Sequence, residues 1–168
     1  MWSVHGALCF TAEDAGATAV TGLDVMGATA QFEAERERRG SAVRFVQGDV
    51  HDPGVVEPHD VVWCSGVLYH APNPVLTLER LRALTRETLL LATEVLPERR
   101  RRPRAAVFAP EPGTHPAHTV PFDPARGYVG WWWGLAPSTV LAMLDATGFE
   151  VTEVFRSRHH LTTVATPR

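Results

Sequence analysis

Short apolar runs alternate with amphipathic, charge-bearing segments along most of the chain. The runs are rich in β-branched and aromatic residues and finish at an acid, a serine or a glycine, which predicts buried strands. The segments between them are rich in strong helix formers or carry apolar residues at helical spacing, which predicts helices. The predicted strands cover residues 19–24, 43–46, 61–64, 88–95, 150–155 and 161–166, and the predicted helices cover residues 10–16, 28–40, 73–84 and 137–148.

Capping residues set the predicted helix boundaries. Asn73 followed by Pro74 is a strong start signal, because the asparagine side chain caps the helix and proline suits its first position. Gly16, Gly40 and Gly148 are placed to end helices. Two inner faces are expected from the spacing: Val75, Leu78, Leu81 and Leu84 in one helix, and Val140, Leu141 and Leu144 in the last.

Strands that alternate with helices predict a parallel sheet covered by helices. With 168 residues, 45% of them hydrophobic, the chain suits a single domain spanning residues 1–168. Residues 97–126 break the pattern with prolines, arginines and no apolar periodicity, which predicts an irregular insertion.

Composition indicates a soluble cytoplasmic protein that binds a small molecule. The net charge of −3 gives no chain-wide attraction to nucleic acid or to an anionic membrane. Cys9 and Cys64, the two cysteines, lie in apolar runs, which fits a reducing compartment. The sequence shows no signal peptide, and no apolar run approaches the roughly 20 residues of a membrane span.

The strand ends carry the candidate chemistry, because ligands of open parallel sheets bind where the carboxyl ends of the strands meet. Asp24 closes one predicted strand, and its carboxylate is suited to the two ribose hydroxyls of a nucleoside. Asp49 follows Gly48 after the next strand and is suited to an adenine amino group. The alternatives are a solvated strand end for Asp24 and a simple turn for Gly48-Asp49.

Three segments together resemble class I S-adenosylmethionine (SAM) dependent methyltransferases. "DVVWCSGVLYHAPNPVLTLERLRALTRETLLLATEVL" resembles their stretch from the fourth to the fifth strand, especially in the branch related to tRNA wobble-uridine carboxymethyltransferases. "HGALCFTAEDAGATAVTGLD" resembles the end of the SAM loop with the next helix and strand, and "GWWWGLAPSTVLAMLDATGFEVTEV" resembles the tryptophan-rich segment and terminal helix. The resemblance implies a Rossmann-like three-layer α/β sheet, mostly parallel with an antiparallel final strand.

The resemblance also implies the roles of individual residues, with SAM as the cofactor. Gly6, next to His5, corresponds to the last glycine of the SAM loop, Asp24 to the ribose acid, and Asp49 with Val50 to the adenine contact. Cys64, Ser65 and Gly66 flank the methionine part of the cofactor, and the residues from Leu68 through Tyr69 to His70 line the site.

The N-terminus departs from the family pattern. The pattern runs from a buried strand into an acid-x-Gly-x-x-x-Gly loop, whereas Trp2 stands at the first glycine and only Met1 precedes it. The first strand of the sheet is therefore expected to be missing, as in an N-terminally truncated chain. Residues upstream of Met1, another segment or a partner chain would complete the sheet, or the chain is a degenerate remnant.

Other residues have both a functional and a plain structural interpretation. His70 with Tyr69 is the catalytic candidate, since imidazole titrates near neutral pH, although alignment matters more than proton removal in methyl transfer. The tryptophans at 131–133 suit stacking on a substrate or packing as a lid. The histidines at 115, 118, 159 and 160 lack the partners of a metal site, and the arginines at 99–102 and 104 give weak support for nucleic acid. The sequence therefore predicts no metal site.

The predicted function is transfer of a methyl group from SAM to a small molecule or a nucleoside. The alternative is a non-catalytic pseudo-methyltransferase that acts as a binding or subunit-interface module. An NAD-dependent Rossmann enzyme is a weaker alternative, because the glycine fingerprint is incomplete.

Overall fold

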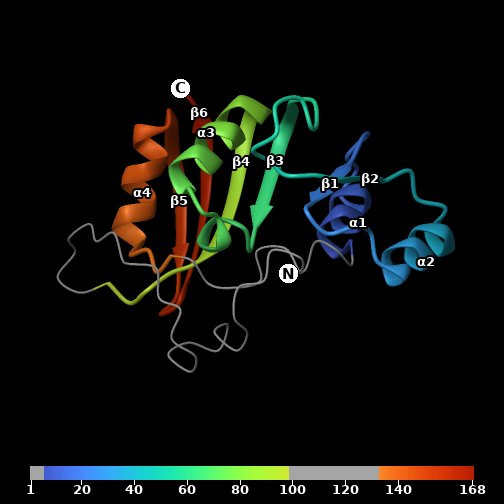
Figure 1. Ribbon diagram of the computed structural model, residues 1–168, viewed down its shortest axis with the longest axis horizontal. Helices are drawn as coiled ribbons and strands as arrows, with labels where there is room; N and C mark the ends of the chain where they lie inside the picture. Colours follow the sequence, from blue (N-terminus) through green and yellow to red (C-terminus); the bar gives the residue numbers. More distant parts are fainter. Residues whose placement is uncertain (1–5, 99–132) are drawn as a thin grey trace. The chain divides into compact units, whose positions relative to one another are not determined.

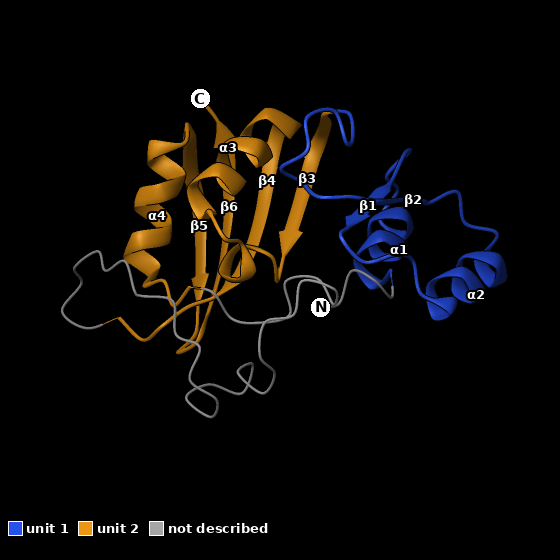
Figure 2. Ribbon diagram, viewed as in Figure 1, with its two compact units in different colours: residues 1–57 blue, residues 58–168 orange. Residues whose placement is uncertain are grey.

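The computed structural model describes residues 6–98 and 133–168. The chain forms two compact units, Met1–Glu57 and Pro58–Arg168, which Figure 2 shows in different colours. The single domain over residues 1–168 stays a prediction. The insertion expected at 97–126 lies outside the described residues except for Pro97 and Glu98.

Unit 1 consists of two helices and a small parallel sheet. Its elements are α1 (Ala7–Asp14), β1 (Thr21–Asp24), α2 (Ala30–Arg39) and β2 (Arg44–Gln47). β1 and β2 pair in parallel from Thr21↔Arg44 to Asp24↔Gln47. Local caps set the limits of α2: the Thr29 hydroxyl accepts a hydrogen bond from the Phe32 N–H, and Gly40 ends the helix at φ 60°.

Aromatic rings form the core of unit 1. Phe32 of α2 is fully buried, and its ring lies 5.4 Å from that of Phe10 and 5.2 Å from that of Phe45, measured between centroids. Cys9 and Val43 are also buried in this cluster. The core therefore joins both helices to the strand β2.

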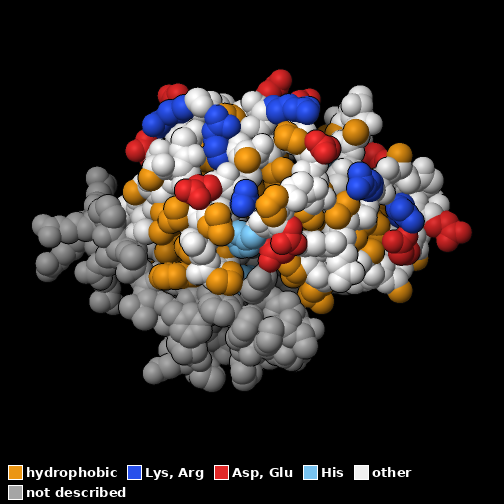
Figure 3. Space-filling model, turned by 45° about the horizontal axis from the view of Figure 1, so that its top comes forward, with side chains coloured by type: hydrophobic (Ala, Val, Ile, Leu, Met, Phe, Trp, Pro, Cys, Tyr) orange, Lys and Arg blue, Asp and Glu red, His pale blue; other side chains and the backbone are white. Residues whose placement is uncertain are grey.

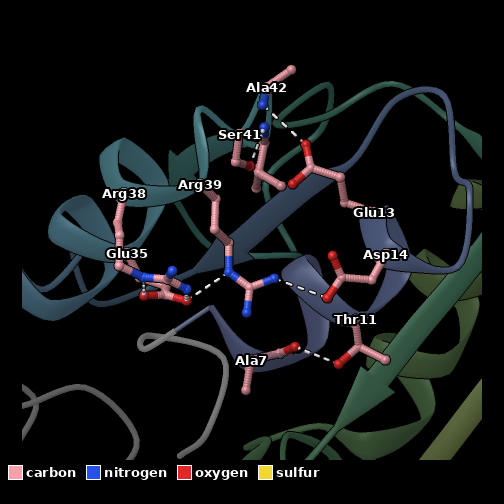
Figure 4. A network of polar contacts seen from close by, with 10 residues as sticks. Ala7, Thr11, Glu13, Asp14, Glu35, Arg38, Arg39, Ser41 and Ala42 are labelled. Carbon is pink, nitrogen blue, oxygen red and sulfur yellow. Dashed lines mark hydrogen bonds and ion pairs between the residues drawn. The ribbon is translucent and has the colours of Figure 1, made fainter.

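A charged network on the surface of unit 1 links the same two helices (Figure 4). The Arg39 guanidinium donates to Glu35 of its own helix at 2.6 Å and to Asp14 of α1 at 2.8 Å, and it lies 4.9 Å from the centre of the Phe10 ring. Hydrogen bonds from Arg38, the larger cause, and from Arg39 lower the pKa of Glu35 to about 2. Arg39 therefore links α1 to α2 beside the aromatic core.

Unit 2 is a four-stranded mixed sheet with two helices. Its elements are β3 (His59–Ser65), the 3₁₀ turn η1 (Leu68–His70), α3 (Pro74–Leu84), β4 (Thr85–Glu94), α4 (Pro137–Ala146), β5 (Phe149–Arg156) and β6 (His160–Pro167). The strand order is β3-β4-β6-β5. β3 and β4 are parallel, and β6 is antiparallel to both of its neighbours. The helices α3 and α4 lie on one face of this sheet (Figure 1).

The predicted Rossmann-like arrangement of strands and helices is confirmed, including the antiparallel final strand. Asn73 caps α3 as expected, with its Oδ1 accepting from the Leu76 N–H, but the predicted inner face is wrong at Val75, which is 40% exposed. The buried stripe instead contains Pro74 and Thr77. Thr77 can be buried because its hydroxyl donates a hydrogen bond to the Asn73 carbonyl at 3.0 Å and so does not depend on water for a partner. In α4, Leu141 is only half-buried, whereas Val140 and Leu144 are fully buried.

The strands β1 and β3 each have one strand neighbour among the described residues, β2 and β4 respectively. The additional strand that the family pattern places before α1 is not among the described elements.

In the described part of the chain, no helix has the length and apolarity of a membrane span. Acidic and basic side chains are interspersed on the face drawn in Figure 3.

Candidate functional site

Two carboxylates lie at the carboxyl edge of the sheet in unit 1. Asp24 is the last residue of β1, opposite Gln47, the last residue of β2, and Asp49 follows two residues later. The Gly48 N–H donates to the Asp24 carbonyl at 2.9 Å, which ties the two strand ends together. The structure thus brings together the two acids that the sequence assigns to ribose and adenine.

Each carboxylate is oriented by a backbone N–H two residues further along the chain. Asp24 Oδ1 accepts from the Met26 N–H at 2.9 Å, and Asp49 Oδ1 accepts from the His51 N–H at 2.9 Å. Both bonds belong to the Asx type of turn, and a turn was the alternative interpretation of Gly48-Asp49. The turn and the binding role are compatible, because a carboxylate offers about four acceptor sites. Val50, the other predicted adenine contact, is half-buried in this loop.

Gly6 begins α1 in the left-handed conformation, with φ 77°. A Cβ atom at this position would overlap Phe32 Cδ2 and lie 2.7 Å from Phe10 Cε2. Packing against the aromatic core therefore requires glycine here, independently of any ligand. Its predicted neighbour in the cofactor site, His5, lies outside the described residues.

In unit 2, the other predicted cofactor residues lie at the carboxyl end of β3. Cys64 and Ser65 are the last two residues of the strand, and Gly66 follows with φ 73° and donates its N–H to the Ala92 carbonyl at 3.0 Å. Burial raises the pKa of the Cys64 thiol to about 12. Cys64 is therefore an uncharged thiol at neutral pH and not a nucleophile.

Tyr69 and His70 lie side by side in the turn η1. Both side chains are buried, with ring centroids 4.1 Å apart. Burial, and secondly the negative charge of Glu94, raise the pKa of Tyr69 to about 12. The phenol therefore stays protonated near neutral pH and is not a base there.

Trp133 is hydrogen-bonded to the segment that contains Tyr69 and Pro72. Its backbone N–H donates to the Tyr69 carbonyl at 3.0 Å, and its indole Nε1 donates to the Pro72 carbonyl at 3.2 Å. The other two members of the predicted substrate group, Trp131 and Trp132, lie outside the described residues, as do the arginines at 99–102 and 104.

Glu94 is a candidate residue that sequence reasoning missed. It is the last residue of β4, half-buried, and its charge acts on Tyr69. The signal was present in the sequence, because an apolar strand closing on an acid is the same pattern that singled out Asp24. Glu94 was not identified as a strand end, because the predicted strand continued to Val95.

The two units thus carry different chemistry at their strand ends. Unit 1 presents two carboxylates, which accept hydrogen bonds from hydroxyl and amino groups. Unit 2 presents an uncharged thiol, an uncharged phenol, the imidazole of His70 and the carboxylate of Glu94. The first set suits the polar edge of a nucleoside, and the second places the imidazole of His70 beside the phenol of Tyr69.

Solved structures similar to this chain share its fold at low sequence identity. A 1,6-didemethyltoxoflavin-N1-methyltransferase from Burkholderia thailandensis, with 1,6-didemethyltoxoflavin and S-adenosylhomocysteine bound, has TM-score 0.68 and 19% identity over 97% of this chain and 67% of that one. The magnesium protoporphyrin IX methyltransferase ChlM from Synechocystis PCC 6803, with SAM bound, has TM-score 0.65 and 16% identity over 98% and 66%. The [4+2]-cyclase SpnF has TM-score 0.71 and 13% identity over 97% and 71%.

These likenesses show the fold alone, and the presence of a cyclase among them illustrates that this fold is not confined to one reaction. No curated protein matched the sequence. A protein-family model described as "Methyltransferase domain" matches residues 4–91. This match covers more than half of the chain, including β1, β2, β3 and most of β4. The chain therefore belongs to the methyltransferase domain family.

Proposed function

We propose that this chain is a SAM-dependent methyltransferase acting on a small molecule or a nucleoside. The observation that carries the proposal is the pair of carboxylates, Asp24 and Asp49, at one edge of a parallel sheet in a member of the methyltransferase domain family. SAM contains an adenosine whose ribose hydroxyls and exocyclic amino group are hydrogen-bond donors. Carboxylates are acceptors, so the donor set of the cofactor fits the residues present.

The proposed contacts follow the order of the chain. Asp24 accepts from the ribose hydroxyls, and Asp49 with Val50 binds the adenine. His5 and Gly6 are proposed to bind the cofactor as the end of the SAM loop, and residues 64–66 flank its methionine part. The tryptophans at 131–133 are proposed to bind the substrate. The solved structures with SAM or S-adenosylhomocysteine bound support this cofactor.

The chemistry required from the chain is mainly alignment. When bound, SAM supplies a methyl group whose bond to sulfur breaks as a bond to a lone pair of the acceptor forms, leaving S-adenosylhomocysteine. The uncharged side chains of Cys64 and Tyr69 offer no competing nucleophile near neutral pH. His70 is proposed to take the proton that the acceptor loses, on an imidazole nitrogen.

The proposed acceptor is a small molecule or a nucleoside. The first class is supported by the similar structure that holds 1,6-didemethyltoxoflavin. The second comes from the resemblance of residues 60–96 to the tRNA wobble-uridine carboxymethyltransferase branch. Methyl-transfer assays with radiolabelled SAM, on cell-extract metabolites and separately on tRNA, distinguish the two classes.

Calorimetric titration of the full chain with S-adenosylhomocysteine tests the cofactor site. Asp24→Asn retains an oxygen that accepts from the Met26 N–H but loses the charge, so we expect about 10- to 100-fold weaker binding with the fold intact. Asp60→Asn is the matched control, because Asp60 is an exposed carboxylate near the amino end of β3. Equal affinity in the Asp24 variant and the wild type would disprove the ribose assignment. Absence of binding at millimolar ligand would disprove the proposed function and leave a non-catalytic binding module.

A further inference from the structure

His51 holds the carboxylate of Asp49 through two hydrogen bonds to the same oxygen. The backbone N–H of His51 donates to Asp49 Oδ1 at 2.9 Å, and the imidazole Nδ1 lies 2.7 Å from that oxygen. Both side chains are mostly buried, at 20% and 22% exposed. A carboxylate carries no hydrogen near neutral pH, so Nδ1 must carry the hydrogen of this bond. The imidazole is therefore a donor toward Asp49 whether the ring is neutral or charged.

The loop around Asp49 is fixed by further contacts within unit 1. Gly48 is tied to Asp24, as described above, and the Asp52 N–H donates to the Asp49 carbonyl at 3.0 Å. Val55 folds back so closely that a Cβ atom at Gly48 would lie 2.5 Å from Val55 Cγ2. The backbone of Asp49 is thus held from both sides. The His51 imidazole adds a second contact to the oxygen that its backbone N–H already bonds, so the rotation of the carboxylate is held more firmly than by the backbone alone.

From this geometry we infer that His51 is a positioning residue that orients Asp49 toward the exocyclic amino group of a bound adenine. The inference rests on the proposed function, because the adenine belongs to the proposed cofactor. A carboxylate accepts from an amino group but repels a carbonyl oxygen, so an oriented Asp49 discriminates between 6-amino and 6-oxo purines. A carboxylate held by the backbone N–H alone would discriminate less, since it could turn away from the carbonyl oxygen more easily. His51 thereby contributes to base selectivity without touching the base.

The test compares two ligands on the full chain. One is S-adenosylhomocysteine, and the other is its S-inosyl analogue, in which oxygen replaces the exocyclic amino group. We expect His51→Ala to weaken binding of S-adenosylhomocysteine about tenfold, because a less firmly oriented Asp49 loses most of its hydrogen bond from the amino group, and to change binding of the analogue by less than about twofold. The ratio of the two dissociation constants is the readout, because general damage to the loop would weaken both ligands together.

Two further variants control the experiment. His51→Asn places an amide N–H at the position of Nδ1, so it should restore most of the wild-type ratio. His59→Ala removes a histidine at the start of β3 and should leave the ratio unchanged. An unchanged ratio in His51→Ala, or an equal loss for both ligands, would overturn the positioning role while leaving the proposed function intact. Failure of the wild-type chain to bind either ligand would overturn both.

Discussion

Replacing Gly6 by alanine tests why the chain needs glycine at the start of α1. The sequence resemblance places this glycine in the cofactor loop, where it would allow close approach of a ligand. The structure gives a reason inside the protein: Gly6 has φ 77°, and a Cβ atom there would overlap Phe32 and crowd Phe10. Both rings are almost fully buried, at 0% and 3% exposed, so neither has space to move.

The expected loss of stability has two parts. An alanine in the left-handed conformation costs about 1–2 kcal/mol. Forcing a methyl group into a filled core costs about 1–3 kcal/mol more. Gly16 provides a matched control, because it also has a positive φ, 95°, but a Cβ there would have no atom within 4 Å. The backbone and unfolded-state contributions largely cancel between the two variants, so Gly6→Ala should be less stable than Gly16→Ala by about 1–3 kcal/mol.

Urea unfolding of the full chain, followed by far-ultraviolet circular dichroism, measures this difference. Hydrogen–deuterium exchange of peptides from α1 and α2 locates it, with peptides from β4 and β6 as an internal reference. If Gly6→Ala and Gly16→Ala unfold at the same free energy, the packing argument is refuted. In that case an effect of Gly6→Ala on S-adenosylhomocysteine binding alone would support the cofactor-loop role.

Two further predictions concern unit 2. Asn73→Ala should lower the free energy of unfolding by about 1 kcal/mol, because α3 loses the cap on the Leu76 N–H, whereas Asn73→Asp, which keeps an acceptor, should stay near wild type in urea unfolding. The pKa of Tyr69 is raised from 10.0 to about 12 in the folded state, so its contribution to stability should be complete below about pH 10 and disappear as the pH rises toward 12. A difference titration of phenolate absorbance between wild type and Tyr69→Phe checks this, and ionisation at an ordinary pKa would contradict the burial of the phenol.

Sequence reasoning predicted those parts of the fold that local backbone chemistry decides. Asn73-Pro74 starts a helix and Gly40 ends one, because an N-cap acceptor and a left-handed residue act on their nearest neighbours in the chain. Apolar runs located all six described strands to within a few residues. The strand β4 begins at Thr85 rather than at residue 88, because α3 passes into it directly. Its first three residues, Thr85, Arg86 and Glu87, are polar, so the apolar run does not include them.

The same reasoning located the candidate site but not its internal contacts. Asp24 and Asp49 were identified because strand ends converge in a parallel sheet, a rule that holds without coordinates. The bond from His51 to Asp49 depends on side-chain rotamers, which spacing does not specify. The burial of Tyr69 beside the charge of Glu94 depends on tertiary packing between β4 and the turn η1, and no local pattern encodes it.

In the proposed methyl transfer, the protonation states of Cys64 and Tyr69 favour catalysis by alignment over catalysis by charge. Burial keeps the Cys64 thiol and the Tyr69 phenol neutral across the physiological pH range, so neither provides an anionic nucleophile or base. A sulfonium methyl donor needs little activation, since its leaving group departs as a neutral thioether, and correct orientation of the acceptor supplies most of the rate. The charged group of this set is Glu94, whose negative charge acts on Tyr69. In the proposed mechanism, this leaves removal of the acceptor's proton as the step that needs a base, which is proposed to be His70.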